Sequence, residues 1–327
     1  METPGEMLTR SQPKKFRRRL LAWYDAHRRD LPWRASRDPY RVWLSEIMLQ
    51  QTRVAAVIEH YQEFLRRFPT VEKLAAAREA SVLAAWSGLG YYRRARMMHA
   101  AAKTIVRELG GKFPANERGL RALPGVGRYT AAAIASIAFD EPVAVVDGNV
   151  ERVLQRAAGK RLAGEELWTA ANHLLDAKRP GDFNQALMEL GATVCTPRAP
   201  VCLTCPAVEL CSTRGELTPM VKPSRQKKRE LHYALNCQNG AVFLVRRSHE
   251  ASLMPGMWEL PERTNGNGAG SPAFTLRHSI TMTDYTVQVW GLVASSRANG
   301  KWIPVERLGK IALTGLARKI LKSAQIL

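Results

Sequence analysis

One stretch of this 327-residue chain holds residue types that could build a site for an anionic ligand. Leu123–Val150 starts with a tight turn, Pro124-Gly125-Val126-Gly127, and continues into a helix of small residues over 129–138. Two glycines at a helix N-terminus leave backbone N–H groups free to bind a phosphate. The stretch ends near Asp147, an acid within Asp-Gly-Asn ahead of the next predicted helix. We expect the turn to bind a nucleic-acid phosphate and Asp147 to face the bound substrate.

Four of the five cysteines lie close together near residue 200. Cys195, Cys202, Cys205 and Cys211 have the spacing C-x6-C-x2-C-x5-C. Four thiolates in so short a segment can surround one compact inorganic core. Tetrahedral zinc also accepts four thiolates, so the ligand count leaves zinc and an iron–sulfur cluster both open. The fifth cysteine, Cys237, stands in a predicted strand, where we expect a core thiol.

The composition favours a polyanionic partner. Lys and Arg number 49 against 29 Asp and Glu, which gives a formal net charge of +20. Such an excess is typical of proteins that bind nucleic acid, although solubility or affinity for acidic lipid would also explain it. No apolar run reaches the roughly 18 residues that span a bilayer, and residues 1–20 contain no apolar signal core. We therefore expect a cytoplasmic, nucleoid-associated protein with no membrane partner.

Helical periodicity runs through the first 211 residues, and no alternating strand pattern of any length appears before residue 230. Residues 1–13 are expected to be disordered. A basic helix is predicted from residue 14 and is broken by the segment 31–34. Further helices are expected over 39–68 as a pair, after Pro69-Thr70, over 77–109 with a break at 88–90, and near 149–158, 164–176 and 183–194. Residues 14–212 are thus predicted to be all-α, with the cysteine loop at 195–211.

The sequence changes in character after residue 212. Residues 213–230 are polar and hold two prolines and six basic residues, which predicts a linker. The following segment, LHYALNCQNGAVFLVRR, has two strand-like runs around an Asn-Gly turn, a hairpin signal. TVQVWGLVAS indicates another strand and the terminal LARKILKSAQIL a helix. Residues 231–327 are therefore predicted to form a small α+β domain.

Together these motifs resemble the helix-hairpin-helix DNA glycosylases of the endonuclease III superfamily, and within it the adenine DNA glycosylases of the MutY family. The resemblance is carried by LPWR (31–34), VWLSEIMLQQT (42–52), GLGYYRRAR (88–96), LPGVGRYTA (123–131), VDGNV (146–150), FNQALMELG (183–191) and the cysteine spacing. It implies a mainly α, two-lobed protein with one [4Fe–4S] cluster. It also implies a monomer whose partner is double-stranded DNA containing adenine opposite 8-oxoguanine or guanine.

The resemblance assigns the chemistry to Glu46 and Asp147. Glu46 is the only charged residue in the mostly apolar Val42–Leu49, and burial would raise its pKa into the range of a general acid at neutral pH. It matches the family's proton donor; without the family, an ion-paired helix carboxylate would be the competing interpretation. Asp147 would stabilise an oxocarbenium-like sugar while capping the next helix, whose N-terminus favours a negative charge. Asn149 is expected to orient the pair.

Residue 129 separates two branches of the superfamily. The lyase branch carries a nucleophilic Lys at the matching position, whereas this chain has Tyr129 and no Lys between Lys112 and Lys160. We predict a monofunctional enzyme that hydrolyses the N-glycosidic bond and leaves an abasic site, with Tyr129 assisting Asp147 or packing at the hairpin helix. Two alternatives remain: an endonuclease III-like glycosylase/lyase for oxidised pyrimidines, and a non-catalytic iron–sulfur DNA-binding module.

The target base must leave the stack before the acid can reach it, and the resemblance implies the side chains that serve this step. They are Gln50, Gln51 and Tyr91 in the gap of the duplex, Arg34, Trp33 and Gln185 in the adenine pocket, and Gly125, Val126 and Gly127 at the backbone. A glutamine amide can pair with an adenine edge through two hydrogen bonds.

Residues 231–327 resemble the Nudix-like domain with which this family inspects 8-oxoguanine. MPGMWELPE (254–262) and LRHSIT (276–281) carry this resemblance. The Nudix catalytic box REUxEExGU is absent, so phosphohydrolase activity is not expected. Where the family has Phe-Ser-His, this chain has Ile280-Thr281-Met282, which keeps an apolar wedge and a hydroxyl but lacks the His. Thr281 is the expected lesion contact, and the preference between 8-oxoguanine and guanine stays open.

Overall fold

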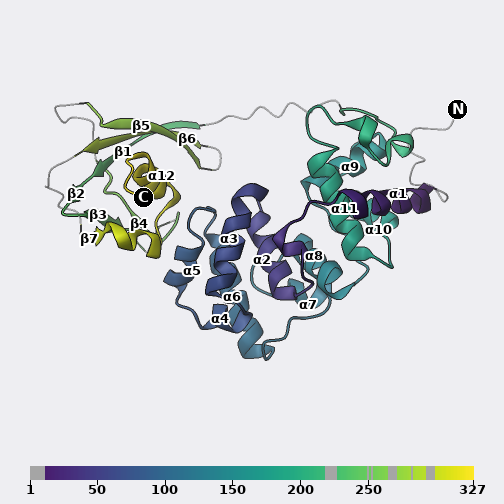
Figure 1. Cartoon of the computed structure of the whole chain (residues 1–327), viewed down its shortest axis with the longest axis horizontal. Helices are drawn as coiled ribbons and strands as arrows, with labels where there is room; N and C mark the ends of the chain where they lie inside the picture. Colours follow the sequence, from purple (N-terminus) through teal and green to yellow (C-terminus); the bar gives the residue numbers. More distant parts are fainter. Residues whose placement is uncertain are drawn as a thin grey trace. The chain divides into compact units, whose positions relative to one another are not determined.

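The computed structural model describes residues 12–217, 227–248, 250–251, 253–263, 271–280, 283–291 and 299–327 (Figure 1). In these ranges every strand follows residue 226, so the predicted all-α character of the earlier part is confirmed. The helices are α1 (Gln12–His27), α2 (Pro39–Leu49), α3 (Val54–Arg67), α4 (Val71–Ala76), α5 (Glu79–Ala85), α6 (Arg93–Glu108), α7 (Glu117–Arg121), α8 (Arg128–Phe139), α9 (Gly148–Ala158), α10 (Glu165–Leu174) and α11 (Pro180–Thr193). None of the described helices has the length and apolar character to cross a membrane.

Helix boundaries follow local signals closely. The break at 31–34 is a 3₁₀ turn, η2 (Pro32–Arg34), and α2 starts where the Asp38 side chain accepts a hydrogen bond of 2.9 Å from the Arg41 N–H. Such a cap, with Pro39 at the first helical position, fixes the start of α2 and hence the position of Glu46 two turns later. Helix α1 begins at Gln12, two residues before the predicted start; residues 1–11 are outside the described part.

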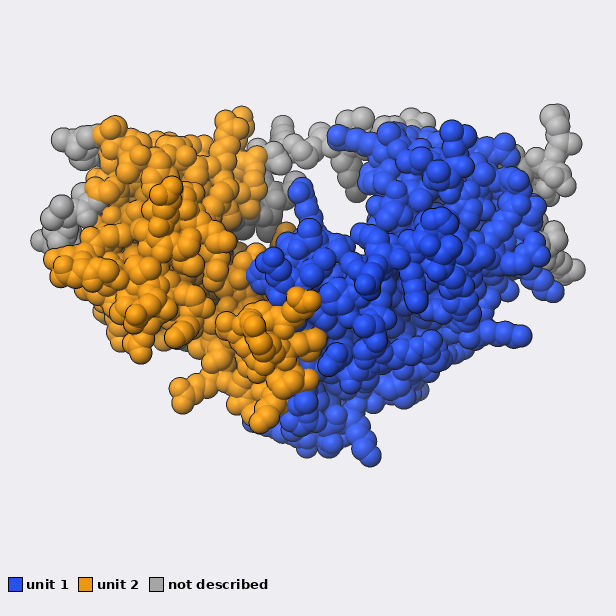
Figure 2. Space-filling model, in the orientation of Figure 1, with its two compact units in different colours: residues 1–61, 70–72, 101–221 blue, residues 62–69, 73–100, 222–327 orange. Residues whose placement is uncertain are grey.

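The chain divides into two compact units (Figure 2). One comprises Met1–Tyr61, Thr70–Glu72 and Ala101–Val221; the other comprises Gln62–Pro69, Lys73–Ala100 and Lys222–Leu327. Helices α2, α8 and α9, which carry most of the predicted catalytic residues, and α11, which carries the predicted base-binding Gln185, all belong to the first unit. The geometry of the candidate site can therefore be described within one unit.

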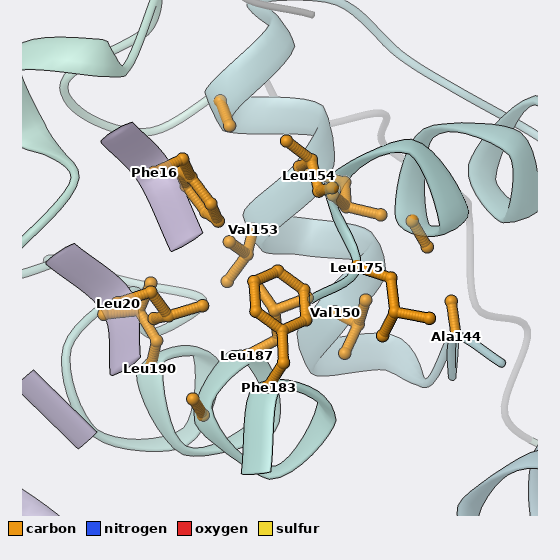
Figure 3. Packing of buried hydrophobic residues seen from close by; sticks show 14 of the residues in the cluster. Phe16, Leu20, Ala144, Val150, Val153, Leu154, Leu175, Phe183, Leu187 and Leu190 are labelled. Atoms are coloured by element: carbon orange, nitrogen blue, oxygen red, sulfur yellow. The ribbon is translucent and has the colours of Figure 1, made fainter. Parts of the chain in front are cut away.

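A single apolar core joins α1 to helices that follow it by more than 130 residues (Figure 3). Phe16 of α1 meets Phe183 of α11 edge to face, with ring centroids 6.4 Å apart, and both rings are buried. Val153 of α9 lies in the same cluster. Burying each such ring contributes about 1.5–3 kcal/mol of transfer free energy, so the N-terminal helix is held against the helices leading to the cysteine loop.

Two glycines let α11 approach its neighbours closely. A Cβ added at Gly181 would lie 2.6 Å from the carbonyl oxygen of Ser136 in α8. A Cβ added at Gly191 would lie 2.6 Å from Cβ of Asn149 in α9. Real Cβ atoms do not make contacts that short, so α8, α9 and α11 can take this spacing only with glycine at both positions. The first turn of α9 is thereby fixed in place.

The described part of the C-terminal region, from residue 227 onward, has two small sheets and one α-helix (Figure 1). The strands are β1 (Lys227–Leu235), β2 (Cys237–Gln238), β3 (Ala241–Arg246), β4 (Trp258–Glu259), β5 (Phe274–Ile280), β6 (Thr283–Gly291) and β7 (Gly300–Pro304), followed by η5 (Val305–Lys310) and α12 (Gly315–Ser323). One sheet has the order β1-β6-β5; the other has the order β2-β3-β4, with β7 paired to β3. The predicted α+β character of this region is confirmed.

The predicted hairpin forms, but it is shorter than expected. Asn239 and Gly240 take positive φ angles of 50° and 69°, as a two-residue hairpin turn requires, and β2 pairs with β3. The run Lys227–Leu235 instead pairs in parallel with β6, so residues 227–230 lie in a strand and not in a linker. Cys237 is exposed, so its prediction as a core thiol is wrong: β2 has only two residues, and both face solvent.

Candidate active site

A cavity of about 830 Å³ in the first unit brings together most of the residues predicted from the sequence. They are Trp33, Arg34, Glu46, Gln50, Gln51, Gly125, Gly127, Tyr129, Asp147, Asn149 and Gln185. These positions span more than 150 residues of sequence, and only the packing of α2, α8, α9 and α11 places them around one space. Such a convergence of titratable and hydrogen-bonding groups in a concave site is typical of an active site.

Glu46 projects from α2 and is 6% exposed. Burial raises the pKa of its carboxyl group to about 7; a hydrogen bond from Tyr129 lowers it, the nearby charge of Asp147 raises it, and Arg34 lowers it. The carboxyl group therefore exchanges its proton near neutral pH. Since a general acid works best with a pKa near the pH of the reaction, this carboxyl is suited to donate a proton into the cavity.

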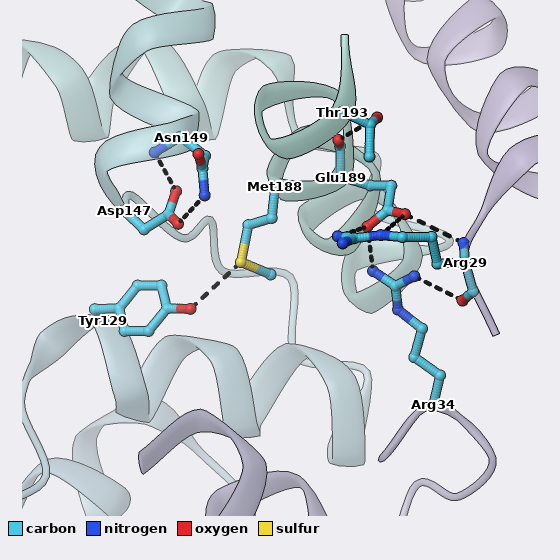
Figure 4. A network of polar contacts seen from close by, with 8 residues as sticks. All are labelled: Arg29, Arg34, Tyr129, Asp147, Asn149, Met188, Glu189 and Thr193. Carbon is cyan, nitrogen blue, oxygen red and sulfur yellow. Dashed lines mark hydrogen bonds and ion pairs between the residues drawn. The ribbon is translucent and has the colours of Figure 1, made fainter. Parts of the chain in front are cut away.

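Tyr129, the second residue of α8, contacts Glu46 directly. Its hydroxyl group lies 2.7 Å from Oε2 of Glu46. The same hydroxyl lies 3.3 Å from the sulfur of Met188 on α11 (Figure 4). Burial and the nearby carboxylates of Glu46 and Asp147 raise the pKa of Tyr129 well above its ordinary value. The phenol is thus protonated over the physiological pH range and acts as a hydrogen-bond donor.

Asp147 is the N-cap of α9, as its sequence context predicted. Its Oδ1 accepts hydrogen bonds from the N–H groups of Asn149, at 2.9 Å, and Val150, at 2.7 Å. Its Oδ2 accepts one of 3.0 Å from the side-chain amide of Asn149 (Figure 4). Three hydrogen bonds and the positive end of the helix dipole hold the carboxylate in one orientation at the cavity.

The segment that leads to Asp147 pairs with no strand among the described residues, and side-chain amides hold its backbone instead. Asn184 on α11 is fully buried; its Oδ1 accepts from the Val145 N–H at 3.2 Å, and its Nδ2 donates to the Val143 carbonyl at 2.9 Å. Asn172 accepts similarly from the Ala144 N–H at 3.2 Å. These bonds satisfy the extended backbone and so fix the start of α9.

Arg152 connects the N-terminal end of α9 to the cysteine loop. Its guanidinium group donates 2.7 Å hydrogen bonds to Oδ1 of Asn149, to the carbonyl of Gly191 and to the carbonyl of Cys195. The Asn149 side chain therefore lies between Asp147 and Arg152. Two side chains, Arg152 and Asn149, therefore connect the loop at Cys195 to Asp147, so a movement of the loop would also move Asp147.

A second polar network lies around Glu189 on α11, which is 1% exposed (Figure 4). Arg29 donates from Nε and Nη2 at 2.7 and 2.8 Å, and Arg34 donates from Nη2 at 2.8 Å. Burial alone would raise the pKa of Glu189, but these bonds lower it to about 2. Arg34 also lies over the ring of Tyr24, 5.5 Å from its centroid. Its guanidinium is therefore held rigidly beside the cavity.

Two of the residues predicted to fill the duplex gap have strained backbones. Gln51 has a φ of 54° and Tyr91 has a φ of 47°. Non-glycine residues rarely adopt such angles, and when they do the site is often functional. Gln51 is exposed at the cavity, and Tyr91 is 50% exposed in the second unit. Gln50 is instead held by a 3.2 Å hydrogen bond to the Thr130 hydroxyl.

The three residues of the glycine turn that were expected to contact the DNA backbone differ in accessibility. Val126 is buried, and its N–H donates to the Leu123 carbonyl at 3.2 Å, so this residue stabilises the turn and its amide is already paired. Gly125, with a φ of 73°, and Gly127 are both exposed. Thr281 lies outside the described residues, so its predicted role remains a prediction.

The four clustered cysteines surround one small cavity together with Arg156. Arg156 lies one helical turn after Arg152 on α9, and its Nη1 is 3.3 Å from the Cys195 sulfur. The Arg214 N–H donates to the Cys211 sulfur at 3.4 Å. Among the described residues, no three His, Cys, Asp or Glu side chains are grouped to hold a single metal ion. The four thiols thus line one common cavity.

Three functional neighbours were missed at the sequence level: Met188, Glu189 and Arg152. Met188 and Glu189 are inside the FNQALMELG motif, where only Gln185 was singled out. Glu189, like Glu46, is an acidic residue within an apolar helical stretch. The same sequence pattern therefore points to both residues. Arg152 gives no such signal, because an arginine on an amphipathic helix is usually solvated.

The fold and the cavity define a class of protein. The family described as HhH-GPD superfamily base excision DNA repair protein matches residues 44–166, a range that includes Glu46, Tyr129 and Asp147. A solved structure of a thermostable thymine-DNA glycosylase is 33% identical, with a TM-score of 0.59, and the match covers 62% of this chain and 96% of that one. The predicted helix-hairpin-helix fold is confirmed.

Similarity to curated relatives shows which family within this class the chain belongs to. Adenine DNA glycosylase of Rattus norvegicus is 53% identical over 313 residues, 76% of this chain and 60% of the relative. Adenine DNA glycosylase of Schizosaccharomyces pombe is 40% identical over 323 residues, 77% of this chain and 70% of the relative. The chain belongs to the adenine DNA glycosylase family, which confirms the family predicted from its motifs. It spans about 60% of the length of the rat relative.

Proposed function

We propose that this protein is a DNA glycosylase that removes adenine mispaired with 8-oxoguanine or guanine by hydrolysing the N-glycosidic bond. The observation that carries this proposal is a pair of carboxyl groups with opposite environments on one cavity. Glu46 is buried and has a pKa of about 7, whereas Asp147 accepts three hydrogen bonds at a helix N-terminus. The first is suited to give a proton, and the second is held in one orientation at the cavity by its hydrogen bonds.

Glu46 is the proposed proton donor. Adenine leaves as an anion unless a ring nitrogen is protonated first, so an acid beside the base lowers the barrier to bond cleavage. Tyr129 positions the carboxyl group through its 2.7 Å hydrogen bond. Because the phenol donates to Oε2, the other carboxyl oxygen is the one available to carry the proton toward the base.

Asp147 stabilises the sugar in this proposal. Loss of the base leaves an oxocarbenium-like ring with positive charge, and a fixed carboxylate beside that ring lowers its energy. The bonds from Asn149 and Val150 prevent the carboxylate from turning away, so little reorganisation is needed during the reaction. Asn149 is thus a positioning residue, held in turn by Arg152.

The product is an abasic site with an intact strand. A lyase needs an amine nucleophile at the sugar, and no lysine is among the described residues that line the cavity. Tyr129 occupies the matching position, and its hydroxyl is engaged with Glu46. Water is therefore the proposed nucleophile, and the reaction is a hydrolysis.

Recognition of the base is assigned to groups on the cavity wall. Gln185 lies on α11 and lines the cavity, where its amide offers one donor and one acceptor to an adenine edge. Arg34 is locked between Glu189 and Tyr24, and Trp33 is a buried wall residue. Gln51 and Tyr91 are proposed to fill the space left in the duplex, with their strained backbones holding them exposed.

The cysteine loop is proposed to hold one [4Fe–4S] cluster. Its ligands would be Cys195, Cys202, Cys205 and Cys211, which share one cavity. The donor set fits: four thiols are present, none forms a disulfide, and Arg156 points a cation at the Cys195 sulfur, where a thiolate cluster carries negative charge. When bound, the cluster would cross-link the parts of the loop that carry the four cysteines, and Arg156 of α9 would contact it at the Cys195 sulfur.

The C-terminal region is proposed to read the base opposite the adenine, with Thr281 as the lesion contact, so the partner is a duplex containing A:8-oxoguanine or A:G. The protein is proposed to act as a monomer at the nucleoid.

The test is adenine release, measured by chromatography, from otherwise identical duplexes containing A:8-oxoguanine, A:G or A:T. Release from the first two and none from A:T supports the proposal. Release of an oxidised pyrimidine instead, or binding with no base release, supports one of the alternatives.

A further inference from the structure

Arg128 lines the active-site cavity but has no part in the chemistry proposed above. It is the first residue of α8 and follows Gly127 of the glycine turn. Its guanidinium carbon lies 3.9 Å from the ring centroid of Trp168, and its Nη1 forms an ion pair with the carboxylate of Glu165. Glu165 and Trp168 both belong to α10, and all three residues lie in the first unit.

The two contacts of Arg128 differ in how easily they can be replaced. The ring of Trp168 fixes the plane of the guanidinium through a cation–π interaction and leaves the N–H edges free. Glu165 covers one of these edges, but its side chain is 78% exposed, against 35% for Arg128. An ion pair this exposed contributes little to stability. An anion with similar oxygen geometry could therefore displace Glu165 while Trp168 keeps Arg128 in position.

The surroundings indicate which anion would do so. A phosphodiester presents to a guanidinium the same pair of oxygens that a carboxylate does. No side chain caps the N-terminus of α8, and a Cβ added at Gly127 would meet nothing within 4 Å, so the space beside Arg128 is open. The hydrogen bond from Arg128 and the charges of Arg128 and Arg121 lower the pKa of Glu165, so two cations favour a negative charge at the place of this carboxylate.

We propose that Arg128 binds a phosphate of the DNA strand that enters the cavity, and that Glu165 occupies the place of this phosphate in the free protein. Glu165 acts as an internal competitor that duplex DNA must displace, and Trp168 keeps the guanidinium ready for the exchange. The inference rests on the proposed function, since it requires a DNA ligand. It identifies Arg128 as a residue that sets affinity for the DNA backbone and not for the base.

The experiment measures binding of a short fluorescein-labelled duplex without a mismatch, by anisotropy over a series of NaCl concentrations, to the full chain. Glu165→Gln is expected to tighten binding about two- to fivefold relative to Glu166→Gln, which removes the same charge from the neighbouring exposed residue. Arg128→Gln is expected to weaken binding about three- to tenfold and to reduce the salt slope by about 1. In the Arg128→Gln background, Glu165→Gln should no longer tighten binding.

Equal effects of Glu165→Gln and Glu166→Gln would overturn the inference, because the gain would then reflect net charge alone. Tighter duplex binding caused by Glu165→Gln in the Arg128→Gln background would overturn it as well. If Arg128→Gln does not fold, as judged by thermal unfolding, the difference in duplex affinity between Glu165→Gln and Glu166→Gln still tests the proposal.

Adenine release measured on the same preparations separates this inference from the proposed function. A protein that shows the binding pattern but releases no adenine refutes the function and leaves the phosphate site intact. A protein that releases adenine without the binding pattern refutes only the role of Arg128 and Glu165.

Discussion

The Tyr129 hydroxyl donates a 2.7 Å hydrogen bond to Oε2 of Glu46, so the residue at the lyase position contacts the proposed proton donor. Burial favours the neutral carboxyl group, and this hydrogen bond favours the charged one. With the charges of Asp147, which raises this pKa, and Arg34, which lowers it, the result is a pKa of about 7. The identity of residue 129 thus bears on two properties at once: the absence of an amine nucleophile and the acidity of Glu46.

Replacing Tyr129 with Phe should shift the pH dependence of adenine release. Loss of the donor removes an interaction that lowers the pKa of Glu46, so this pKa rises and the carboxyl group stays protonated to higher pH. In single-turnover assays the alkaline limb should move upward by as much as about one pH unit. Tyr61→Phe is the control, because the buried Tyr61 hydroxyl has no hydrogen-bond partner among the described residues. An unchanged or downward-shifted limb would contradict the assignment.

Borohydride should trap no covalent adduct between the wild-type protein and a substrate duplex. The described cavity lining contains no lysine, and the Tyr129 hydroxyl cannot form a Schiff base. Denaturing gel electrophoresis after reduction gives the measurement. A stoichiometric adduct would favour the glycosylase/lyase alternative, and strand cleavage without heat or base treatment would point the same way.

Glu46→Gln should stabilise the fold above neutral pH. The folded pKa of Glu46 is about 7 and its ordinary value is 4.5, so between these values the folded state binds more protons than the unfolded state. Stability therefore falls as pH rises from 4.5 to 7, by up to about 3 kcal/mol. The Gln variant lacks this loss, so its Tm should exceed the wild-type value at pH 8 and match it near pH 4.5. Glu108→Gln, at an exposed position, should show no such pH-dependent difference.

Gly191→Ala should reduce both stability and activity. Its added methyl group would lie 2.6 Å from Cβ of Asn149, which pushes the first turn of α9 and displaces Asp147. A misplacement of about 1 Å can cost roughly 100-fold in rate. Gly315→Ala in α12 is the matched control, since its added Cβ meets nothing within 4 Å. Wild-type rates and Tm in the Gly191 variant would show that α9 is not positioned by this contact.

Metal analysis of the purified protein tests the cysteine loop. We expect iron and sulfide in the ratio of a [4Fe–4S] cluster, with the brown colour of such proteins, and loss of both in Cys202→Ser. Cys237→Ser is the control, because Cys237 is exposed on β2 and remote in sequence from the loop. A colourless protein that contains zinc and no iron would contradict the cluster.

Local signals explain what the sequence could predict. The helical period located the helices up to α11 within a few residues, except the five-residue α7, which was not predicted. The Asp-Gly-Asn segment predicted the cap at Asp147 that the structure has. An isolated acid in an apolar stretch predicted the burial of Glu46. Each of these features depends on residues within one or two helical turns, which is the range over which sequence patterns act.

What could not be predicted depends on contacts between distant segments. Glu189 meets Arg29 across 160 residues, and nothing near either residue indicates the pairing. The parallel pairing of β1 with β6 likewise joins two distant segments, so the charged start of β1 looked like a linker. Cys237 was placed in a core because the strand pattern around it continued, whereas the tight turn at Asn239-Gly240 leaves β2 only two residues long.

The central claim is that Glu46 protonates the adenine, and single-turnover release from an A:8-oxoguanine duplex tests it most directly. Glu46→Gln keeps the shape of the side chain and removes its acidity, with duplex binding measured in parallel as a control for folding. We expect a loss of at least about 100-fold in the rate with binding retained, and a wild-type rate that falls above about pH 7. Release at the wild-type rate by the Gln variant would contradict it.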